Sequence, residues 1–222
     1  MTNDEREKTV DRQTDKVYPQ KVQIPLDPFV NEGGEAAKRL GNASHWLRLL
    51  LFVSGAQRIL EIGTGNGYLT AVMAQEVKAS GGWVFSVEPS QDVAVAARRR
   101  WESLDAADAI QQGVGDTGSL LAQRLPDSFD CIVQHAQANA LETELDQCLR
   151  VLRVGGFLAA FRPQPDAASI SSDIWLSPQD ALVQRLTDCQ TLETVFVPGG
   201  GGLLVARKPE PLGGVIAHEY LD

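Results

Sequence analysis

The sequence predicts an α/β fold in which a doubly wound, mainly parallel sheet carries helices on both faces. From Arg58 onward, short β-branched runs alternate with helical stretches, which is the pattern of βαβ units. A glycine-rich turn, residues 63–67, separates the first such run from the next helix, where sheets of this kind bind ligands. At 222 residues, the chain is long enough for one well-buried domain.

The N-terminal part of the chain predicts an arm followed by a cap. Residues 1–23 alternate charged and amide side chains with few apolar ones, so they are expected to form a flexible arm. Residues 24–56 are expected to form a helical cap, with helices near Glu32–Leu40 and Ser44–Val53 and Ser44 as the N-cap of the second. Residues 57–208 are expected to form the ligand-binding core. Cap and core together make a single domain, residues 24–208, and residues 209–222 form a C-terminal tail.

The core predicts five strands in chain order and then a hairpin. The strands are expected at Arg58–Ile62, Trp83–Glu88, Ala109–Val114, Phe129–Gln134 and Phe157–Phe161. Helices are expected between them near Tyr68–Lys78, Gln91–Ser103, Ser119–Leu125 and Ala140–Val151. Pro198 and the glycines after it separate Thr191–Val197 from Gly202–Arg207, which predicts an antiparallel hairpin. The sheet is therefore expected to be mixed, with a reversed edge strand.

Composition narrows the classes of partner. A formal charge of −9 and a pI near 4.9 would repel a phosphate backbone, so a small-molecule substrate is expected and nucleic acid is not. No run approaches the ~18 apolar residues of a membrane span, and the N-terminus does not resemble a signal peptide. The three cysteines, Cys131, Cys148 and Cys189, are widely spaced and are interpreted as reduced structural thiols. We therefore expect a cytoplasmic protein without a membrane anchor.

The strongest local motif is the run Glu61-Ile62-Gly63-Thr64-Gly65-Asn66-Gly67. Glycines at this position let the backbone turn sharply and approach a ligand closely. The dinucleotide fingerprint would require glycine or alanine where this chain has Tyr68, so nicotinamide binding is disfavoured.

Two acidic residues follow the next two strands. Glu88 ends the second strand, where a carboxylate can accept the hydrogens of both ribose hydroxyls, although a solvated glutamate is the alternative. Asp116 follows Gly115 after the third strand and could accept a hydrogen bond from an adenine amino group. An ordinary turn is the alternative for Asp116.

In this order the motifs resemble those of class I S-adenosylmethionine-dependent methyltransferases. The resemblance is carried by the glycine loop, Glu88, Gly115-Asp116, Phe129-Asp130, the run 152–156 and the closing stretches 192–198 and 202–208. More narrowly, the order is similar to the bacterial O-methyltransferase family related to the catechol and caffeoyl-coenzyme A methyltransferases. The likeness runs from about Asn42 to Lys208.

This resemblance implies a cofactor, S-adenosyl-L-methionine, with S-adenosyl-L-homocysteine as the product. It implies a Rossmann-like, seven-stranded mixed sheet with the last strand antiparallel, a cap that contributes to the acceptor pocket, and a homodimer. Asn42 to Ser44 are expected near the methionine end of the cofactor. The cofactor-binding residues that it implies are Asn42, Ser44, Glu61, Gly63, Thr64, Gly65, Gly67, Tyr68, Glu88, Pro89, Gly115, Asp116 and Gln134.

The chain departs from the metal-dependent members of that family. Those members place an aspartate after the fourth strand and an Asp-Asn pair after the fifth, positions that match His135, Phe161 and Arg162 here. These side chains cannot supply the oxygen ligands that magnesium prefers, so no metal is expected. A lysine that some relatives use as a base matches Ala138. The sequence therefore predicts a metal-independent enzyme.

Candidates for the acceptor side remain. His135 could remove a proton from the acceptor as the methyl group is transferred, or could be only a hydrogen-bonded wall residue. Arg162 could hold an anionic group of the substrate or could be a surface arginine. His45 and Trp46 could line the substrate pocket, and Trp46 could instead belong to the core.

Three functions are therefore set against one another. The first is an O-methyltransferase acting on a small-molecule acceptor without a divalent metal; oxygen as the target rests on the resemblance, and nitrogen or sulfur stay open. The second is a protein that binds S-adenosylmethionine or its product, has lost catalysis, and acts as a sensor or interaction partner. The third, a nicotinamide oxidoreductase on a related fold, is disfavoured by Tyr68.

Overall fold

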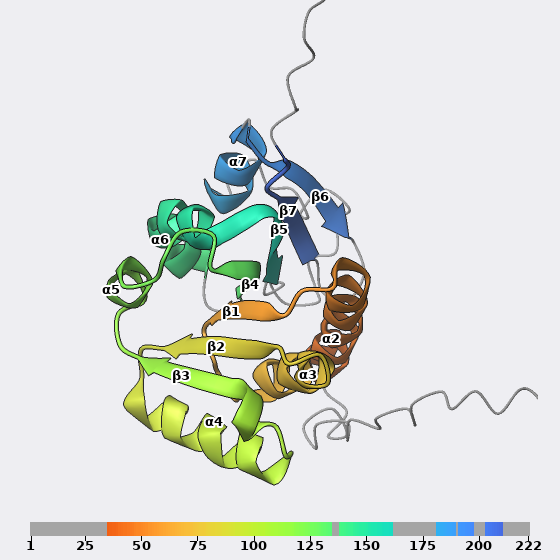
Figure 1. Cartoon of the computed structure of the whole chain (residues 1–222), viewed down its shortest axis with the longest axis vertical. Helices are drawn as coiled ribbons and strands as arrows, with labels where there is room; N and C mark the ends of the chain where they lie inside the picture. Colours follow the sequence, from red (N-terminus) through yellow and green to blue (C-terminus); the bar gives the residue numbers. More distant parts are fainter. Residues whose placement is uncertain (1–34, 135–137, 162–180, 190, 198–202, 211–222) are drawn as a thin grey trace, which may run out of the picture.

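A computed structural model describes residues 35–134, 138–161, 181–189, 191–197 and 203–210 of the chain. These residues form a seven-stranded sheet in the order β3-β2-β1-β4-β5-β7-β6, with helices on both faces (Figure 1). The predicted N-terminal arm, residues 1–23, lies outside the described residues, as do residues 211–222 of the predicted tail.

The elements follow one another as alternating strands and helices. The strands are β1 (Arg58–Ile62), β2 (Trp83–Glu88), β3 (Ile110–Val114), β4 (Phe129–Gln134), β5 (Leu152–Phe161), β6 (Glu193–Val197) and β7 (Leu203–Arg207). The helices are α2 (Glu35–Ser54), α3 (Tyr68–Lys78), α4 (Gln91–Ser103), the short 3₁₀ turn η2 (Ala107–Ala109), α5 (Thr117–Ala122), α6 (Ala138–Val151) and α7 (Ala181–Asp188).

The sheet is mixed, as the sequence predicts. Strands β1 to β5 are paired in parallel, and β7 runs antiparallel to both β5 and β6. The last strand of the chain is therefore reversed, which confirms the predicted fold class. The reversed strand is not at the edge, however: β7 lies between β5 and β6. That position buries Leu204 and Ala206, whereas Val195 on the edge strand β6 is 61% exposed.

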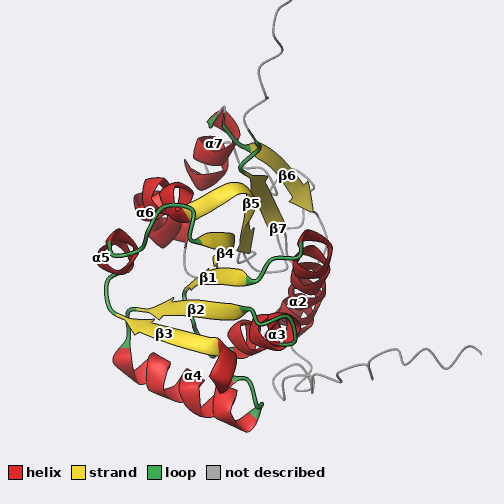
Figure 2. Cartoon of the chain, viewed as in Figure 1, coloured by secondary structure: helices red, strands yellow, loops and turns green. Residues whose placement is uncertain are grey.

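Helices cover both faces of the sheet (Figure 2), and an apolar core lies between the sheet and the helices on each face. The first core joins the strands to α2, α3 and α4, with Leu47, Met73 and Trp101 among its members. The second joins them to α5, α6 and α7, with Leu121, Cys148 and Leu186 among its members. Because successive strand residues point to opposite faces, the buried runs of the parallel strands serve both cores at once.

The predicted pair of cap helices is wrong: residues 35–54 form a single helix, α2, and Ser44 lies inside it rather than at an N-cap. Ser44, Leu47 and Leu51 are buried at helical spacing, and Arg48 forms an ion pair with Glu76 of α3 (Nε to Oε2, 2.9 Å). Helix α2 contains one glycine, Gly41, which costs a helix interior roughly 1 kcal/mol. Burial of the apolar stripe outweighs this cost.

Smaller differences have local causes. Strand β5 begins at Leu152 rather than Phe157, because Gly155 adopts a φ of 73° and the strand continues through the glycine pair instead of ending there. Helix α5 begins at Thr117 rather than Ser119, because Asp116 caps it. Helix α7 was not expected. Strands β3, β6 and β7 and helix α6 differ from their expected ends by one or two residues.

Among the described residues, no helix has the length and apolar character needed to cross a membrane.

The amino-terminal edge of the sheet is held by one carboxylate, that of Asp130 at the start of β4. Its Oδ2 accepts the backbone N–H groups of Gln57 (3.0 Å) and Arg58 (2.8 Å). Its Oδ1 accepts from the guanidinium groups of Arg58 (2.8 Å) and Arg153 (2.7 Å). Burial alone would raise the pKa of Asp130, but these donors outweigh burial and hold it well below its usual range. The carboxylate of Asp130 therefore links the first residues of β1, β4 and β5.

Candidate functional site

The predicted cofactor residues gather at the opposite edge, where the parallel strands end. The register pairs Ile62 with Val87 and with Gln134, and Glu88 with Val114, so β1, β2, β3 and β4 end at nearly the same level. In an open α/β sheet, ligands bind beyond the carboxyl ends of the strands, where the strand order reverses direction. Here the order reverses at β1 and β4, beside the glycine loop.

The glycine loop is fixed in shape by its contact with α4. Gly67 has a φ of 78°, in the left-handed region that favours glycine. A Cβ at Gly67 would lie 2.6 Å from Nε1 of Trp101, and that nitrogen donates a hydrogen bond to the Gly67 carbonyl (2.9 Å). The loop therefore requires glycine at this position for both its backbone conformation and its space.

Glu88 connects the second strand to the loop. It is almost completely buried, and its carboxylate accepts the N–H of Gly65 (3.2 Å) and the N–H of Ser90 (3.0 Å). A carboxylate has about four acceptor positions, so these two bonds leave capacity for hydroxyl donors of a ligand. The structure thus brings the predicted ribose-binding acid and the predicted glycine loop into direct contact. Pro89, beside Glu88, is exposed.

Glu61 lies completely buried at the base of the loop. Its Oε2 accepts hydrogen bonds from Thr70 Oγ1 (2.5 Å) and Ser86 Oγ (2.6 Å), and Ser86 is also bonded to Thr64 (2.6 Å). Its Oε1 is buried and has no hydrogen-bond partner within the described part of the chain. Burial raises the pKa of Glu61 to about 7, against the lowering effect of the two hydroxyl groups and with a further contribution from the charge of Glu88.

Two members of this network, Ser86 and Thr70, were missed from the sequence. Ser86 stands opposite Glu61 in the parallel register, and both hydroxyl residues are fully buried. One feature of the sequence could have identified Ser86: it is the one polar residue in the run 83–87, which otherwise is apolar and is followed by Glu88. A buried polar residue needs a partner, and here the partner is the motif carboxylate.

The remaining predicted cofactor residues differ in their surroundings. Asp116 is exposed and is the N-cap of α5, accepting the N–H of Ser119 (2.8 Å), which lowers its pKa. Tyr68 begins α3, is buried, and donates its N–H to Asn66 Oδ1 (3.0 Å). Ser44 and Gln134 are buried. The side chain of Asn42 lies outside the described residues.

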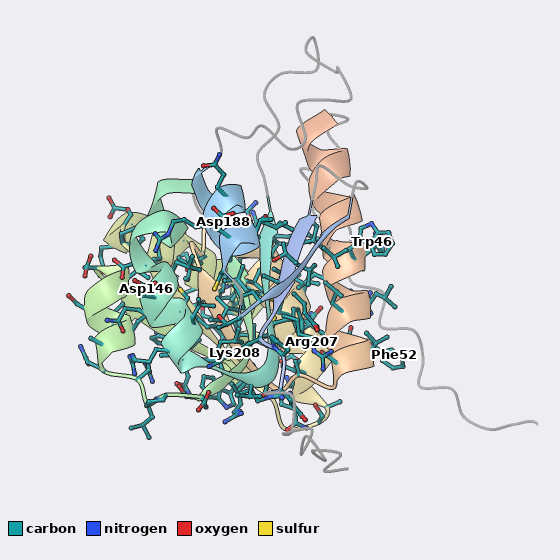
Figure 3. The ribbon with its side chains drawn as sticks, turned by 90° about the horizontal axis from the view of Figure 1, so that it is seen from above. Trp46, Phe52, Asp146, Asp188, Arg207 and Lys208 are labelled. Atoms are coloured by element: carbon teal, nitrogen blue, oxygen red, sulfur yellow. The ribbon has the colours of Figure 1, made fainter. Side chains whose placement is uncertain are left out.

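The acceptor side is described only in part. His135 and Arg162 lie outside the described residues, so their predicted roles are not tested. His45 is exposed on α2. Trp46 does not belong to the core: it is 39% exposed and points away from the strands (Figure 3). Within the described ranges, no cluster of three or more His, Cys, Asp or Glu side chains is placed to hold a metal ion.

Comparison with protein families and curated proteins finds sequence relatives. A family model for Protein-L-isoaspartate(D-aspartate) O-methyltransferase (PCMT) matches residues 1–160. A protein-L-isoaspartate O-methyltransferase 2 from Pelobacter propionicus is 33% identical over 154 residues, 61% of this chain and 62% of the relative. A protein-L-isoaspartate O-methyltransferase from Brucella anthropi is 35% identical over 98 residues, 44% of this chain and 42% of the relative. The chain thus spans about half the length of the curated relatives it matches.

Solved structures share the fold. The O-methyltransferase TomG from Streptomyces achromogenes, solved in complex with SAM, has a TM-score of 0.62 at 20% identity and covers 95% of this chain and 100% of its own. The O-methyltransferase from Bacillus cereus, in complex with SAH, has a TM-score of 0.61 at 22% identity and covers 83% of this chain and 92% of its own. Identities this low establish a common fold and no more.

These findings confirm the broad resemblance and correct the narrow one. The class I methyltransferase fold is confirmed. S-adenosylmethionine as the cofactor is confirmed at the level of the family. The likeness to catechol and caffeoyl-coenzyme A methyltransferases is replaced, because the sequence relatives are isoaspartate methyltransferases.

Proposed function

The chain belongs to the protein-L-isoaspartate(D-aspartate) O-methyltransferase family, and on that premise we propose that it transfers a methyl group from S-adenosylmethionine to a carboxylate oxygen of an isoaspartyl residue in a peptide or protein. The observation that carries this proposal is the convergence of the glycine loop, Glu88 and the buried Glu61 at the carboxyl edge of the sheet. A polypeptide acceptor replaces the small molecule expected from composition.

The residues at this edge fit the proposed cofactor. Glu88 is positioned to accept the ribose hydroxyl hydrogens, and Gly65 lets the backbone approach the cofactor closely. The unpartnered Oε1 of Glu61 is an acceptor that the cofactor's ammonium group would satisfy. Asp116 is exposed beyond β3, where an adenine amino group would reach it.

A carboxylate acceptor also agrees with the residues on the acceptor side. Bound S-adenosylmethionine supplies a methyl carbon, which the acceptor oxygen takes up as the carbon–sulfur bond breaks and its electron pair stays on sulfur. A carboxylate with a pKa near ~4 is already ionised at neutral pH, so no group has to remove a proton. On this proposal, His135 is not needed as a base, and neither is the lysine that some catechol-type O-methyltransferases place where this chain has Ala138.

Positioning then supplies most of the catalysis, since a single displacement needs the acceptor oxygen in line with the breaking bond. Arg162, predicted to hold an anionic group, suits this task because a guanidinium binds a carboxylate through two parallel hydrogen bonds. The pairing would orient one carboxylate oxygen toward the methyl carbon.

A transfer assay tests the proposal. The protein is incubated with methyl-labelled S-adenosylmethionine and, in parallel, an isoaspartyl peptide, the same peptide with ordinary aspartate, and catechol. We expect label on the isoaspartyl peptide, released as methanol at alkaline pH, because a methyl ester hydrolyses in base and an aryl ether does not. Base-stable label on catechol would contradict the proposal. Binding of S-adenosylhomocysteine without transfer to any acceptor would instead support a protein that has lost catalysis.

We also propose that the chain, with residues 24–208 as one domain, forms a homodimer in the cytoplasm. The outer face of α2 offers a surface, since Trp46, Leu49, Phe52 and Val53 are 39%, 48%, 76% and 66% exposed, and the labelled Trp46 and Phe52 both point outward (Figure 3). The free thiols Cys131 and Cys148 favour a reducing compartment. Sedimentation velocity should find a dimer in the wild type and a monomer in Phe52→Asp; a monomeric wild type would contradict the proposed assembly.

A further inference from the structure

Four buried side chains form a directed hydrogen-bond chain beneath the glycine loop. Glu61, Ser86 and Thr70 are completely buried and Thr64 is 3% exposed. An ionised carboxylate only accepts, so Ser86 and Thr70 both donate to Glu61 Oε2. Ser86 has one hydrogen to donate, and Thr64 must therefore donate to Ser86. The chain runs from the loop through β2 to the carboxylate at the end of β1, with α3 supplying the second donor.

The two carboxylate oxygens of Glu61 differ in their hydrogen bonds. Both hydroxyl donors lie on Oε2, whereas Oε1 is equally buried and has no partner in the described part of the chain. A buried carboxylate oxygen without a donor is costly, and a bound proton removes that cost. Burial raises the pKa of Glu61 to about 7, so the free protein carries this proton on a large fraction of molecules near neutral pH.

We propose that Glu61 gives up a proton when S-adenosylmethionine binds, and that Ser86 and Thr70 are positioning residues that hold the ionised carboxylate for the cofactor's ammonium group. The inference rests on the proposed function, because it assumes that the cofactor's amino-acid end lies at Glu61. An ammonium group donates three hydrogen bonds and carries the opposite charge, so it stabilises the ionised form at the oxygen that lacks a partner.

The surroundings of Glu61 fit a ligand-linked role. Among the described residues, Glu88 is the charged group whose field acts on Glu61, and its negative charge favours the protonated form in the free protein. Glu88 is also proposed to bind the cofactor, so a cation arriving between the two carboxylates offsets their repulsion. Ser86 lies directly opposite Glu61 in the sheet and is fully buried, and its hydroxyl group donates to this carboxylate.

Calorimetry in two buffers tests the inference directly. S-adenosylhomocysteine is titrated into the protein at pH 7 in phosphate and in Tris, whose different ionisation enthalpies reveal the number of protons released. We expect roughly half a proton released per ligand bound at pH 7, and almost none at pH 9, where Glu61 is already ionised. The control ligand, 5′-methylthioadenosine, has the adenine and ribose but no ammonium group, and should bind without proton release.

Variants separate positioning from mere packing. Glu61→Gln should bind S-adenosylhomocysteine more weakly and release no proton. Ser86→Ala removes one of the two donors, so proton release should extend to higher pH and the Kd at pH 7 should rise by up to about tenfold for each unit of pKa gained. The matched control is Ser80→Ala, whose hydroxyl bonds the Val77 carbonyl (2.8 Å) away from the site, and it should change neither quantity.

The outcomes distinguish the two levels of the proposal. Wild-type binding of S-adenosylhomocysteine without proton release at pH 7, or an unaltered pH profile in folded Ser86→Ala, would overturn the linkage and leave the proposed function standing. No binding of S-adenosylhomocysteine by the wild type would contradict the proposed function itself.

Discussion

Two buried carboxylates on neighbouring strands, Asp130 at the start of β4 and Glu61 at the end of β1, face opposite edges of the same sheet. Asp130 has donors on both oxygens, from the backbone and from two guanidinium groups. Glu61 has both of its donors on a single oxygen. The pKa of Asp130 is lowered and that of Glu61 is raised, although both side chains are buried.

The difference separates an edge that supports stability from the edge at which we propose that the cofactor binds. A saturated carboxylate favours the folded state in its ionised form, whereas one with an unpartnered oxygen opposes folding once it is ionised. For Asp130 the stabilisation is present above the ordinary carboxyl pKa and is lost as pH falls below it. For Glu61 stability is highest below pH ~4.5 and falls as pH rises through about 7. An incomplete buried group of this kind is typical of a functional site.

The largest expected effect is that of Asp130→Asn. The amide loses the charge that both guanidinium groups face, and its nitrogen cannot accept the two hydrogen bonds that the oxygen it replaces accepts, so the free energy of unfolding at pH 7 should fall by about 3 kcal/mol. Urea denaturation measures this loss, and affinity for S-adenosylhomocysteine should be nearly unchanged. The control Asp108→Asn removes an exposed ion pair with Lys78, which solvent screens, and should lower the free energy of unfolding far less. Equal losses of unfolding free energy in the two variants would contradict the view that Asp130 stabilises the amino-terminal edge of the sheet.

Next in size is Gly67→Ala at the ligand edge. The new Cβ would lie 2.6 Å from Trp101 Nε1 on a backbone with a φ of 78°, so we expect a loss of about 2 kcal/mol together with weaker cofactor binding. Gly55→Ala is the matched control: its φ of 63° is similar but nothing lies within 4 Å of the added carbon. It should cost about 1 kcal/mol and leave binding unchanged. Identical losses would show that Trp101 does not restrict the loop.

The smallest expected effect has the opposite sign. Glu61→Gln removes a buried charge but leaves an amide nitrogen without an acceptor, so at pH 8 the free energy of unfolding should rise by about 1–2 kcal/mol. At pH 4.5 the wild-type carboxyl is itself protonated, and the gain should disappear. Urea denaturation at the two pH values measures the difference. A variant that is less stable than the wild type at pH 8 would mean that Glu61 supports the fold rather than the site.

Much of the fold could be predicted from local pattern. Strands β1 and β2 and helices α3 and α4 begin and end where expected, because β-branched runs and the glycine loop define them locally. Helix α2 was divided in two because Ser44 is a local signal for a helix start, and only the packing of Leu47 and Leu51 overrides it.

The sequence predicted the acidic residues of the candidate site but not the hydroxyl residues that hydrogen-bond to them. Glu61 and Glu88 were identified from their positions at strand ends, but the network of Ser86 and Thr70 depends on strand register and helix packing. The proposed acceptor, a peptide, could not be reached from composition for a related reason. Net charge disfavours nucleic acid, but it does not separate a small molecule from a peptide.

Calorimetric titration with S-adenosylhomocysteine tests the central claim, that the carboxyl edge holds the cofactor, most directly. Glu88→Ala is compared with the wild type, and Asp130→Asn at the opposite edge serves as the folded control. We predict that the wild type binds, that Glu88→Ala loses roughly 30- to 100-fold in affinity, about 2–3 kcal/mol, and that Asp130→Asn binds almost as the wild type does. A wild type that does not bind, or equal affinity in Glu88→Ala, would contradict the account.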